Sequence, residues 1–178
     1  MRTDRLQREY GVDLIWSVFP LHPETPEEGM ELTELFAGRD EEIKTMQARL
    51  LRLAAGEGLP MAERSRTANS RRAQELGKWA EAQGKEDPFR MAVYRAFFVE
   101  GRNIALVDEL MRIAEDVGLQ GEAAREVLAA ESFAAAVDAD WQRARDLGIT
   151  GVPTHLCGGR KLVGFSPYED FLRLIGRG

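Results

Sequence analysis

Cys157 is the only cysteine in the sequence, and His155 precedes it by two residues. Residues two apart on a β-strand point to the same side, so these two side chains could share a face. A neighbouring imidazole lowers the pKa of a thiol and favours the thiolate, which is the nucleophilic form. The alternative, which we favour, is that Cys157 is a small apolar residue entering a turn formed by Gly158 and Gly159.

Other side chains offer little for metal binding or acid–base catalysis. The second histidine, His22, lies between Pro20 and Pro23, where we expect a solvated or packing role. Two histidines and one cysteine at wide spacing do not supply a zinc site. The carboxylates are scattered over predicted helix surfaces and form no evident pair. We therefore expect no metal and no resident cofactor.

Charge and hydropathy exclude several classes of partner. The net charge of −6 over 178 residues gives no electrostatic reason to expect nucleic acid or an anionic membrane. No apolar run approaches the roughly 20 residues that a membrane span needs. The charged N-terminus lacks the apolar core of a secretion signal. Since one cysteine allows no intrachain disulfide, we expect a reducing cytoplasm as the compartment.

Sheet elements are predicted at both ends of the chain. Residues 12–19 are almost all apolar, which predicts a strand covered on both faces. A helix over residues 2–10 precedes it and is expected to end at Gly11. Residues 152–156 and 161–163 are expected to pair as a hairpin around the glycine turn. The Ser166-Pro167 pair then predicts the start of a last helix.

Between these ends, residues 30–147 are predicted to form helix after helix. Apolar residues recur three or four positions apart, as on the buried face of a packed helix. The last of these helices, over residues 132–147, is expected to end at Gly148. The Asp87-Pro88 pair predicts one helix start, with aspartate as the cap. We expect this block to pack as one all-helical insertion. Residues 1–29 and 148–178 would then form the sheet domain of an α/β fold.

Four stretches carry a resemblance to a known family: Trp16 to Pro23, Asn69-Ser-Arg-Arg-Ala-Gln-Glu-Leu, Tyr94-Arg-Ala-Phe-Phe-Val-Glu-Gly-Arg-Asn103, and Gly148 to Gly159. In this order they resemble the DsbA-like branch of the thioredoxin superfamily. Within that branch the sequence is most similar to the FrnE-like and 2-hydroxychromene-2-carboxylate isomerase-like proteins, whose fold kappa-class glutathione transferases share. The resemblance extends from residue 3 onward. It implies a thioredoxin-like α/β fold with a large all-helical insertion.

The sequence departs from that family at its start. Family members begin with a strand, a loop containing Cys-x-x-Cys or a serine, and then the first helix. This sequence begins within that helix, so we expect the nucleophile upstream of Met1. The missing strand would lie between residues 12–19 and 153–156, which leaves two inner edges without partners. Three explanations are considered: Met1 is an internal methionine chosen as the start, strand exchange or a homodimer fills the gap, or the remaining strands pair directly.

The Val152-Pro153-Thr154 stretch matches the family's cis-proline loop. The resemblance implies that a cis Pro153 frees the backbone N–H and C=O of Val152. A thiol-bearing peptide or glutathione would then pair with this backbone as an added strand. Asn69 matches an asparagine near the thiol-ligand pocket of the isomerase and kappa-transferase relatives.

Asn69 lies within a basic stretch that includes Arg64, Arg66, Arg71 and Arg72. The helix start predicted there could hold a carboxylate, as helix N-termini do. The alternative is a helix cap beside a solvated basic face, which is the interpretation we favour.

The resemblance implies a thiol–disulfide oxidoreductase in which a thiolate attacks a disulfide docked beside Pro153. Without a Cys-x-x-Cys motif, the sequence as given predicts no dithiol-dependent activity. One alternative is a glutathione-linked isomerase or transferase, with glutathione as cosubstrate held by Asn69 and Val152. The other is a non-catalytic module that binds peptides at the same loop.

Overall fold

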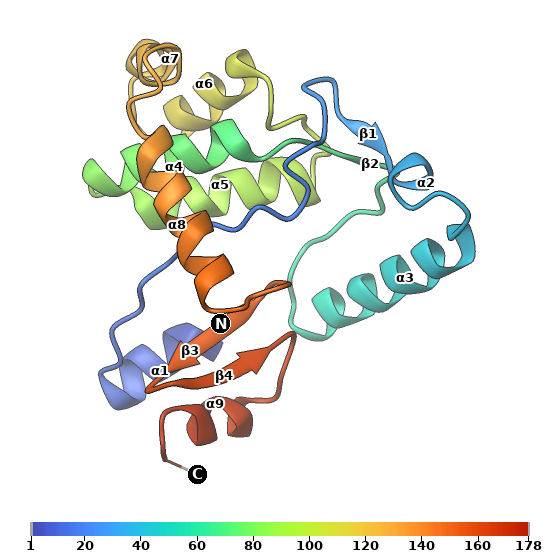
Figure 1. The fold of residues 1–178 in the computed structure, drawn as a ribbon, viewed down its shortest axis with the longest axis vertical. Helices are drawn as coiled ribbons and strands as arrows, with labels where there is room; N and C mark the ends of the chain where they lie inside the picture. Colours follow the sequence, from blue (N-terminus) through green and yellow to red (C-terminus); the bar gives the residue numbers. More distant parts are fainter. Residues whose placement is uncertain (1, 178) are drawn as a thin grey trace. The chain divides into compact units, whose positions relative to one another are not determined.

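The computed structural model describes residues 2–177 (Figure 1). Its helices are α1 (Arg2–Tyr10), α2 (Leu32–Leu35), α3 (Asp40–Gly56), α4 (Arg71–Ala82), α5 (Glu86–Phe98), α6 (Val107–Asp116), α7 (Gly121–Ala129), α8 (Ala134–Asp146) and α9 (Tyr168–Leu174). Its strands are β1 (Met30–Glu31), β2 (Arg66–Thr67), β3 (Thr154–Cys157) and β4 (Arg160–Val163). Every helix in this range is too short or too polar to traverse a lipid bilayer.

Two compact units make up the chain, one of residues 1–21 and 138–178 and the other of residues 22–137. The sequence placed all of α8 in the insertion, whereas most of this helix groups with the sheet unit. Hydrogen bonds link this part of the chain to the sheet unit. Asp140 of α8 accepts a hydrogen bond from the backbone N–H of Val18, and Lys161 of β4 donates to a carbonyl just beyond the helix.

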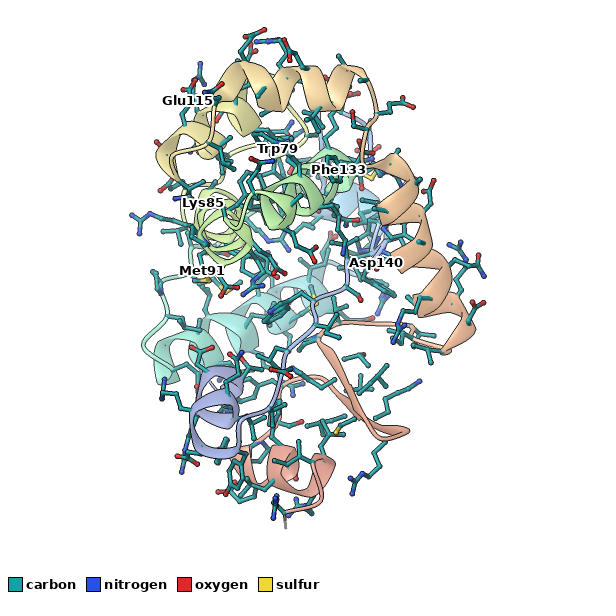
Figure 2. The ribbon with its side chains drawn as sticks, turned by 90° about the vertical axis from the view of Figure 1, so that its left-hand side faces the viewer. Trp79, Lys85, Met91, Glu115, Phe133 and Asp140 are labelled. Atoms are coloured by element: carbon teal, nitrogen blue, oxygen red, sulfur yellow. The ribbon has the colours of Figure 1, made fainter. Side chains whose placement is uncertain are left out.

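A hydrophobic core formed by α4, α5, α6 and α7 holds the unit of residues 22–137 together (Figure 1). Apolar residues at helical spacing place one face of each helix in this core. Phe89, Leu76, Leu110 and Ile113 are among its fully buried side chains. Figure 2 shows Trp79 among these helices, and partly buried Phe133 also packs against the cluster. The predicted helical insertion thus has its own core.

A short antiparallel pair, which the sequence did not predict, interrupts this helical unit. Met30 of β1 pairs with Thr67 of β2, and Glu31 pairs with Arg66. Gly29 precedes the pair with a φ of +83°, and a Cβ at that position would lie 2.7 Å from the carbonyl oxygen of Thr67. Glycine is therefore required for the close approach of these two backbones.

The C-terminal hairpin forms as predicted, with β3 and β4 antiparallel in the other unit. Thr154 pairs with Val163, and Cys157 pairs with Arg160 across the glycine turn. Helix α9 packs next to β4 (Figure 1). The predicted start of α9 is corrected by one residue: Pro167 is the N-cap, and the helix begins at Tyr168, after the buried Ser166.

Helix α1 packs against α9 through a cluster of polar and aromatic side chains. The Tyr168 hydroxyl donates a hydrogen bond to Glu9 at 2.9 Å. Arg5 bonds to the same carboxylate at 2.7 Å and lies over the Tyr168 ring, 3.9 Å from its centroid. The hydrogen bonds from Arg5 and then from Tyr168 hold the pKa of the Glu9 carboxyl below its ordinary value of 4.5.

The predicted strand over residues 12–19 is wrong. This segment is extended, but no described residue pairs with it in a β-ladder. Its side chains alternate between half-buried and exposed positions, and Ile15 is 93% exposed. A strand needs a neighbouring strand for its backbone hydrogen bonds, and apolar composition alone does not supply one.

Helix ends follow the predicted glycines more closely than helix starts follow the predicted caps. Gly11 and Gly148 follow α1 and α8 with φ values of +63° and +59°, a left-handed conformation that glycine tolerates best. The start predicted at Asp87-Pro88 is corrected, because α5 begins at Glu86. Pro88 still falls within the first turn, where a missing N–H breaks no helical hydrogen bond.

Candidate functional site

The first candidate group lies in the loop of residues 149–153, between α8 and β3. The ammonium of Lys161 on β4 donates hydrogen bonds to the carbonyl oxygens of Leu147 and Gly148, at 2.8 and 3.3 Å. Leu147 and Gly148 follow the last residue of α8, so their carbonyls accept no helical hydrogen bond and the ammonium satisfies them instead. These bonds fix the point at which the 149–153 loop begins.

Two further hydrogen bonds hold the end of the same loop. The Thr154 hydroxyl donates to the carbonyl of Gly151 at 2.7 Å. The backbone N–H of Gly164 donates to the carbonyl of Pro153 at 2.8 Å. The peptide bond between Val152 and Pro153 is cis. The carbonyls on either side of Val152 are therefore both occupied.

Val152 itself is open. Neither its N–H nor its C=O has a hydrogen-bond partner among residues 2–177. The residue is 50% exposed, and Pro153 is exposed as well. The arrangement leaves one donor and one acceptor available to an incoming extended backbone.

The environment of His155 is that of a packed side chain and not of a catalytic one. Its ring meets Phe171 of α9 edge-on, with the centroids 4.7 Å apart. Its Nδ1 is buried and has no hydrogen-bond partner in the described part of the chain. Burial lowers the pKa of His155 below its ordinary value of 6.5, so the imidazole is neutral at neutral pH. A neutral imidazole does not provide the positive charge that stabilises a thiolate.

Cys157 is half-buried at the end of β3 and forms no disulfide. It shares a sheet face with His155 by strand alternation, yet no hydrogen bond joins the two within residues 2–177. Cys157 sits directly before Gly158, which has a φ of +53°. This geometry supports the interpretation of a small residue at a turn.

The second candidate residue, Asn69, belongs to the unit of residues 22–137. Its side-chain amide donates to the carbonyls of Pro23 and Thr25, at 3.0 and 2.7 Å. Its Oδ1 accepts the backbone N–H of Arg71 at the start of α4, at 2.9 Å. Both amide hydrogens are thus used inside the protein. In this structure Asn69 braces the 23–28 loop and caps α4.

Asn103 braces the same loop from the turn that precedes α6, and the sequence analysis did not single it out. Its amide donates to the carbonyl of Glu27 at 2.8 Å, and its Oδ1 accepts the N–H of Ala105 at 3.0 Å. Asn69 and Asn103 share the signal that could have identified both. In each case the side-chain oxygen of an asparagine accepts the backbone N–H of the residue two positions later, which closes an Asx-type turn.

The basic stretch around Asn69 is largely neutralised by carboxylates. Its ion pairs are Arg66–Glu31 at 2.5 Å, Arg71–Glu75 at 2.7 Å and Arg72–Glu27 at 3.0 Å. Arg64 instead lies over the rings of Phe97 and Phe98, at 4.7 and 5.5 Å from their centroids. Burial lowers the pKa of Arg64. The stretch thus uses its charge mainly to hold neighbouring segments.

Within residues 2–177 there is no cluster of three or more histidine, cysteine, aspartate or glutamate residues that could hold a metal ion.

Comparison with known proteins adds a consistent set of relatives. Residues 1–176 match the DsbA-like thioredoxin domain family. The probable DsbA oxidoreductase SCO1869 of Streptomyces coelicolor has a similar structure, with a TM-score of 0.86 and 26% identity over 97% of this chain and 79% of that one. A 2-hydroxychromene-2-carboxylate isomerase is similar in fold, with a TM-score of 0.75 and 20% identity over 97% and 83% of the two chains.

A curated relative matches over a shorter stretch. The uncharacterized protein YwbO of Bacillus subtilis (strain 168) is 29% identical over 98 residues, which make up 54% of this chain. The match spans 49% of YwbO, about half of its length.

Proposed function

Because this chain belongs to the DsbA-like thioredoxin domain family, we propose that it serves thiol–disulfide chemistry by holding a cysteine-containing peptide along the backbone of Val152. One observation carries the proposal. The N–H and C=O of Val152, a half-exposed residue, have no hydrogen-bond partner among residues 2–177, while the carbonyls of Gly151 and Pro153 on either side are held.

An extended peptide can satisfy both free groups at once. A donor and an acceptor on the same residue match one residue of an added strand, which receives one hydrogen bond and donates another. Such pairing depends on the peptide backbone, so it accepts many side chains. It places the substrate cysteine beside the 149–153 loop without requiring a thiol from the loop itself.

The exchange step of a dithiol mechanism needs two cysteines, and the sequence contains one. In that step a thiolate attacks one sulfur of the substrate disulfide, a new S–S bond forms, and the other substrate sulfur leaves as a thiolate. Cys157, the single thiol of the sequence, lies on a strand beside a neutral histidine. We therefore assign docking to this chain and expect no dithiol turnover from it.

A backbone-directed binding experiment tests the docking. The probe is an extended peptide of about six residues whose central cysteine is S-methylated, which prevents exchange with Cys157. On titration we expect the amide NMR signals of Gly151 and Val152 to shift with saturation. The matched control peptide carries an N-methyl group on the residue that pairs with Val152, and it should bind far more weakly because one hydrogen bond cannot form.

Two outcomes would overturn the proposal. One is equal binding of the two peptides, and the other is a set of shifts that avoids the 149–153 loop. Cys157→Ser should leave peptide binding unchanged. In a dithiothreitol-driven insulin-reduction assay, the 178-residue polypeptide should match the uncatalysed rate, and measurable turnover would contradict the absence of a dithiol mechanism.

Glutathione-linked isomerase or transferase chemistry is the competing proposal, and it depends on Asn69. That side chain already donates both amide hydrogens to loop carbonyls, so we rank this function second. Saturable heat on titrating reduced glutathione, with shifts at both Asn69 and Val152, would favour it over peptide docking. Peptide binding together with no role in thiol–disulfide exchange would indicate a non-catalytic binding module.

A further inference from the structure

Lys161 connects β4 with the start of the 149–153 loop. It lies opposite Leu156 in the hairpin register. Its ammonium bonds to the carbonyls of Leu147 and Gly148, and no carboxylate lies within ion-pair distance of it among residues 2–177. The bonds that Lys161 makes are therefore directed at backbone, not at a surface ion pair.

Both ends of the loop are held from one short segment. Lys161 fixes the carbonyls before the loop, and Gly164, three residues later, donates to the carbonyl of Pro153 at its end. A five-residue loop clamped at both ends has few alternative conformations. Residues 161–164 thus act as a template for the backbone that presents Val152.

The geometry points to Lys161 as a positioning residue for peptide docking at Val152. This inference rests on the proposed function, because Lys161 touches no part of the site where the peptide would lie. Its contribution is to order the loop before the peptide arrives. Ordering a backbone in its bound conformation strengthens binding because less conformational freedom is lost on association.

The expected effect is a loss of affinity without loss of fold. Lys161→Met keeps the aliphatic stem and removes the ammonium. We expect this variant to bind the S-methylated peptide with an affinity about three- to tenfold lower than that of the parent. Lys161→Arg, which retains a donor of similar reach, should recover most of the affinity.

A matched control comes from the neighbouring residue. Arg160 also donates to a carbonyl near a helix end, that of Arg173 in α9 at 3.3 Å, but it does not bond to the loop. Arg160→Met should therefore leave peptide affinity at the parent value. Amide NMR spectra of the free proteins provide a second measurement. Lys161→Met should move the signals of residues 149–152 while those of the α4–α5 core stay in place.

The outcomes separate this inference from the proposed function. If the parent protein does not bind the peptide, docking fails, and the loop signals of the free Lys161→Met variant still decide whether Lys161 orders the loop. If the parent binds and Lys161→Met binds equally well, the inference is wrong. It is also wrong if Arg160→Met weakens binding to the same extent, or if the loop signals do not move.

Discussion

The carboxylate of Asp140 accepts a hydrogen bond of 3.0 Å from the backbone N–H of Val18, which lies 122 residues earlier in the chain. Figure 2 shows Asp140 on α8, next to the N-terminal segment that includes Val18. The extended residues 12–19 have no strand partner in the described chain. Helix α8 thus supplies, through a side chain, a bond that a sheet would supply through its backbone.

We predict that Asp140→Ala destabilises the protein by about 1.5–3 kcal/mol, the usual range for a hydrogen bond to a charged group. Urea unfolding provides the measurement, and the m-value should stay constant. Asp146→Ala on the same helix is the control, because that exposed carboxylate accepts only from Gln142 nearby. Equal effects of the two substitutions would contradict the role assigned to Asp140.

Asn69→Ala is predicted to cost about 1–3 kcal/mol of unfolding free energy, since it leaves the carbonyls of Pro23 and Thr25 without donors. Hydrogen exchange should increase in residues 23–28 and at the start of α4. The neighbouring variant Ser70→Ala removes only an acceptor for Gln74, so its effect should be much smaller. A stable Asn69→Ala protein with an unchanged loop would show that the bracing bonds do not matter.

Two glycines with similar backbone angles allow steric and conformational effects to be separated. Gly29 and Gly38 have φ values of +83° and +79°, but only at Gly29 does an added Cβ meet the backbone, at 2.7 Å from Thr67. Gly38→Ala should cost about 1–2 kcal/mol for the left-handed conformation alone. Gly29→Ala should cost roughly 1–3 kcal/mol more, because the β1–β2 pair must move. Similar midpoints in thermal unfolding for the two variants would contradict the close approach.

The α1–α9 cluster predicts a specific pH dependence. Tyr168→Phe removes the hydroxyl bond to Glu9 and keeps the ring beneath Arg5. Since the pKa of folded Glu9 lies below 4.5, its bonds stabilise the fold fully above pH 4.5, and this stability is lost as the pH falls through the folded pKa. The variant should be slightly less stable than the parent at pH 7, and the difference should shrink at lower pH.

Urea midpoints measured from pH 7 to pH 3 test this expectation. Tyr94→Phe is the control, because its exposed ring contacts Phe98 and its hydroxyl has no hydrogen-bond partner among residues 2–177. If the difference in urea midpoint between Tyr168→Phe and the parent does not change with pH, the contribution of Tyr168 does not depend on the ionisation of Glu9.

The sequence predicted those elements whose formation depends on residues close together in the chain. The β3–β4 hairpin followed from apolar residues around Gly158 and Gly159, and the end of α8 followed from Gly148. The strand predicted over residues 12–19 failed for a tertiary reason. Its composition suits a sheet, but whether another strand lies beside it depends on residues far away in the chain.

The candidate site shows the same division. Val152 and Pro153 were found through resemblance to a family, and the structure adds the bonds around them. Lys161 and Asn103 were missed because each bonds to backbone carbonyls of another segment, at separations of 13 or 14 and 76 residues. The local turn at Asn103 could have been anticipated, but the residue types do not show which distant carbonyls Asn103 and Lys161 bond to.

Helix α8 has a mechanical consequence for the sheet unit. Asp140 ties its middle to the segment of Val18, and Lys161 ties Leu147 and Gly148, which follow the helix directly, to β4. A shift of the helix along its axis would strain both attachments at once. We therefore expect a displacement of α8 to act both on the segment of Val18 and on the residues that precede the 149–153 loop.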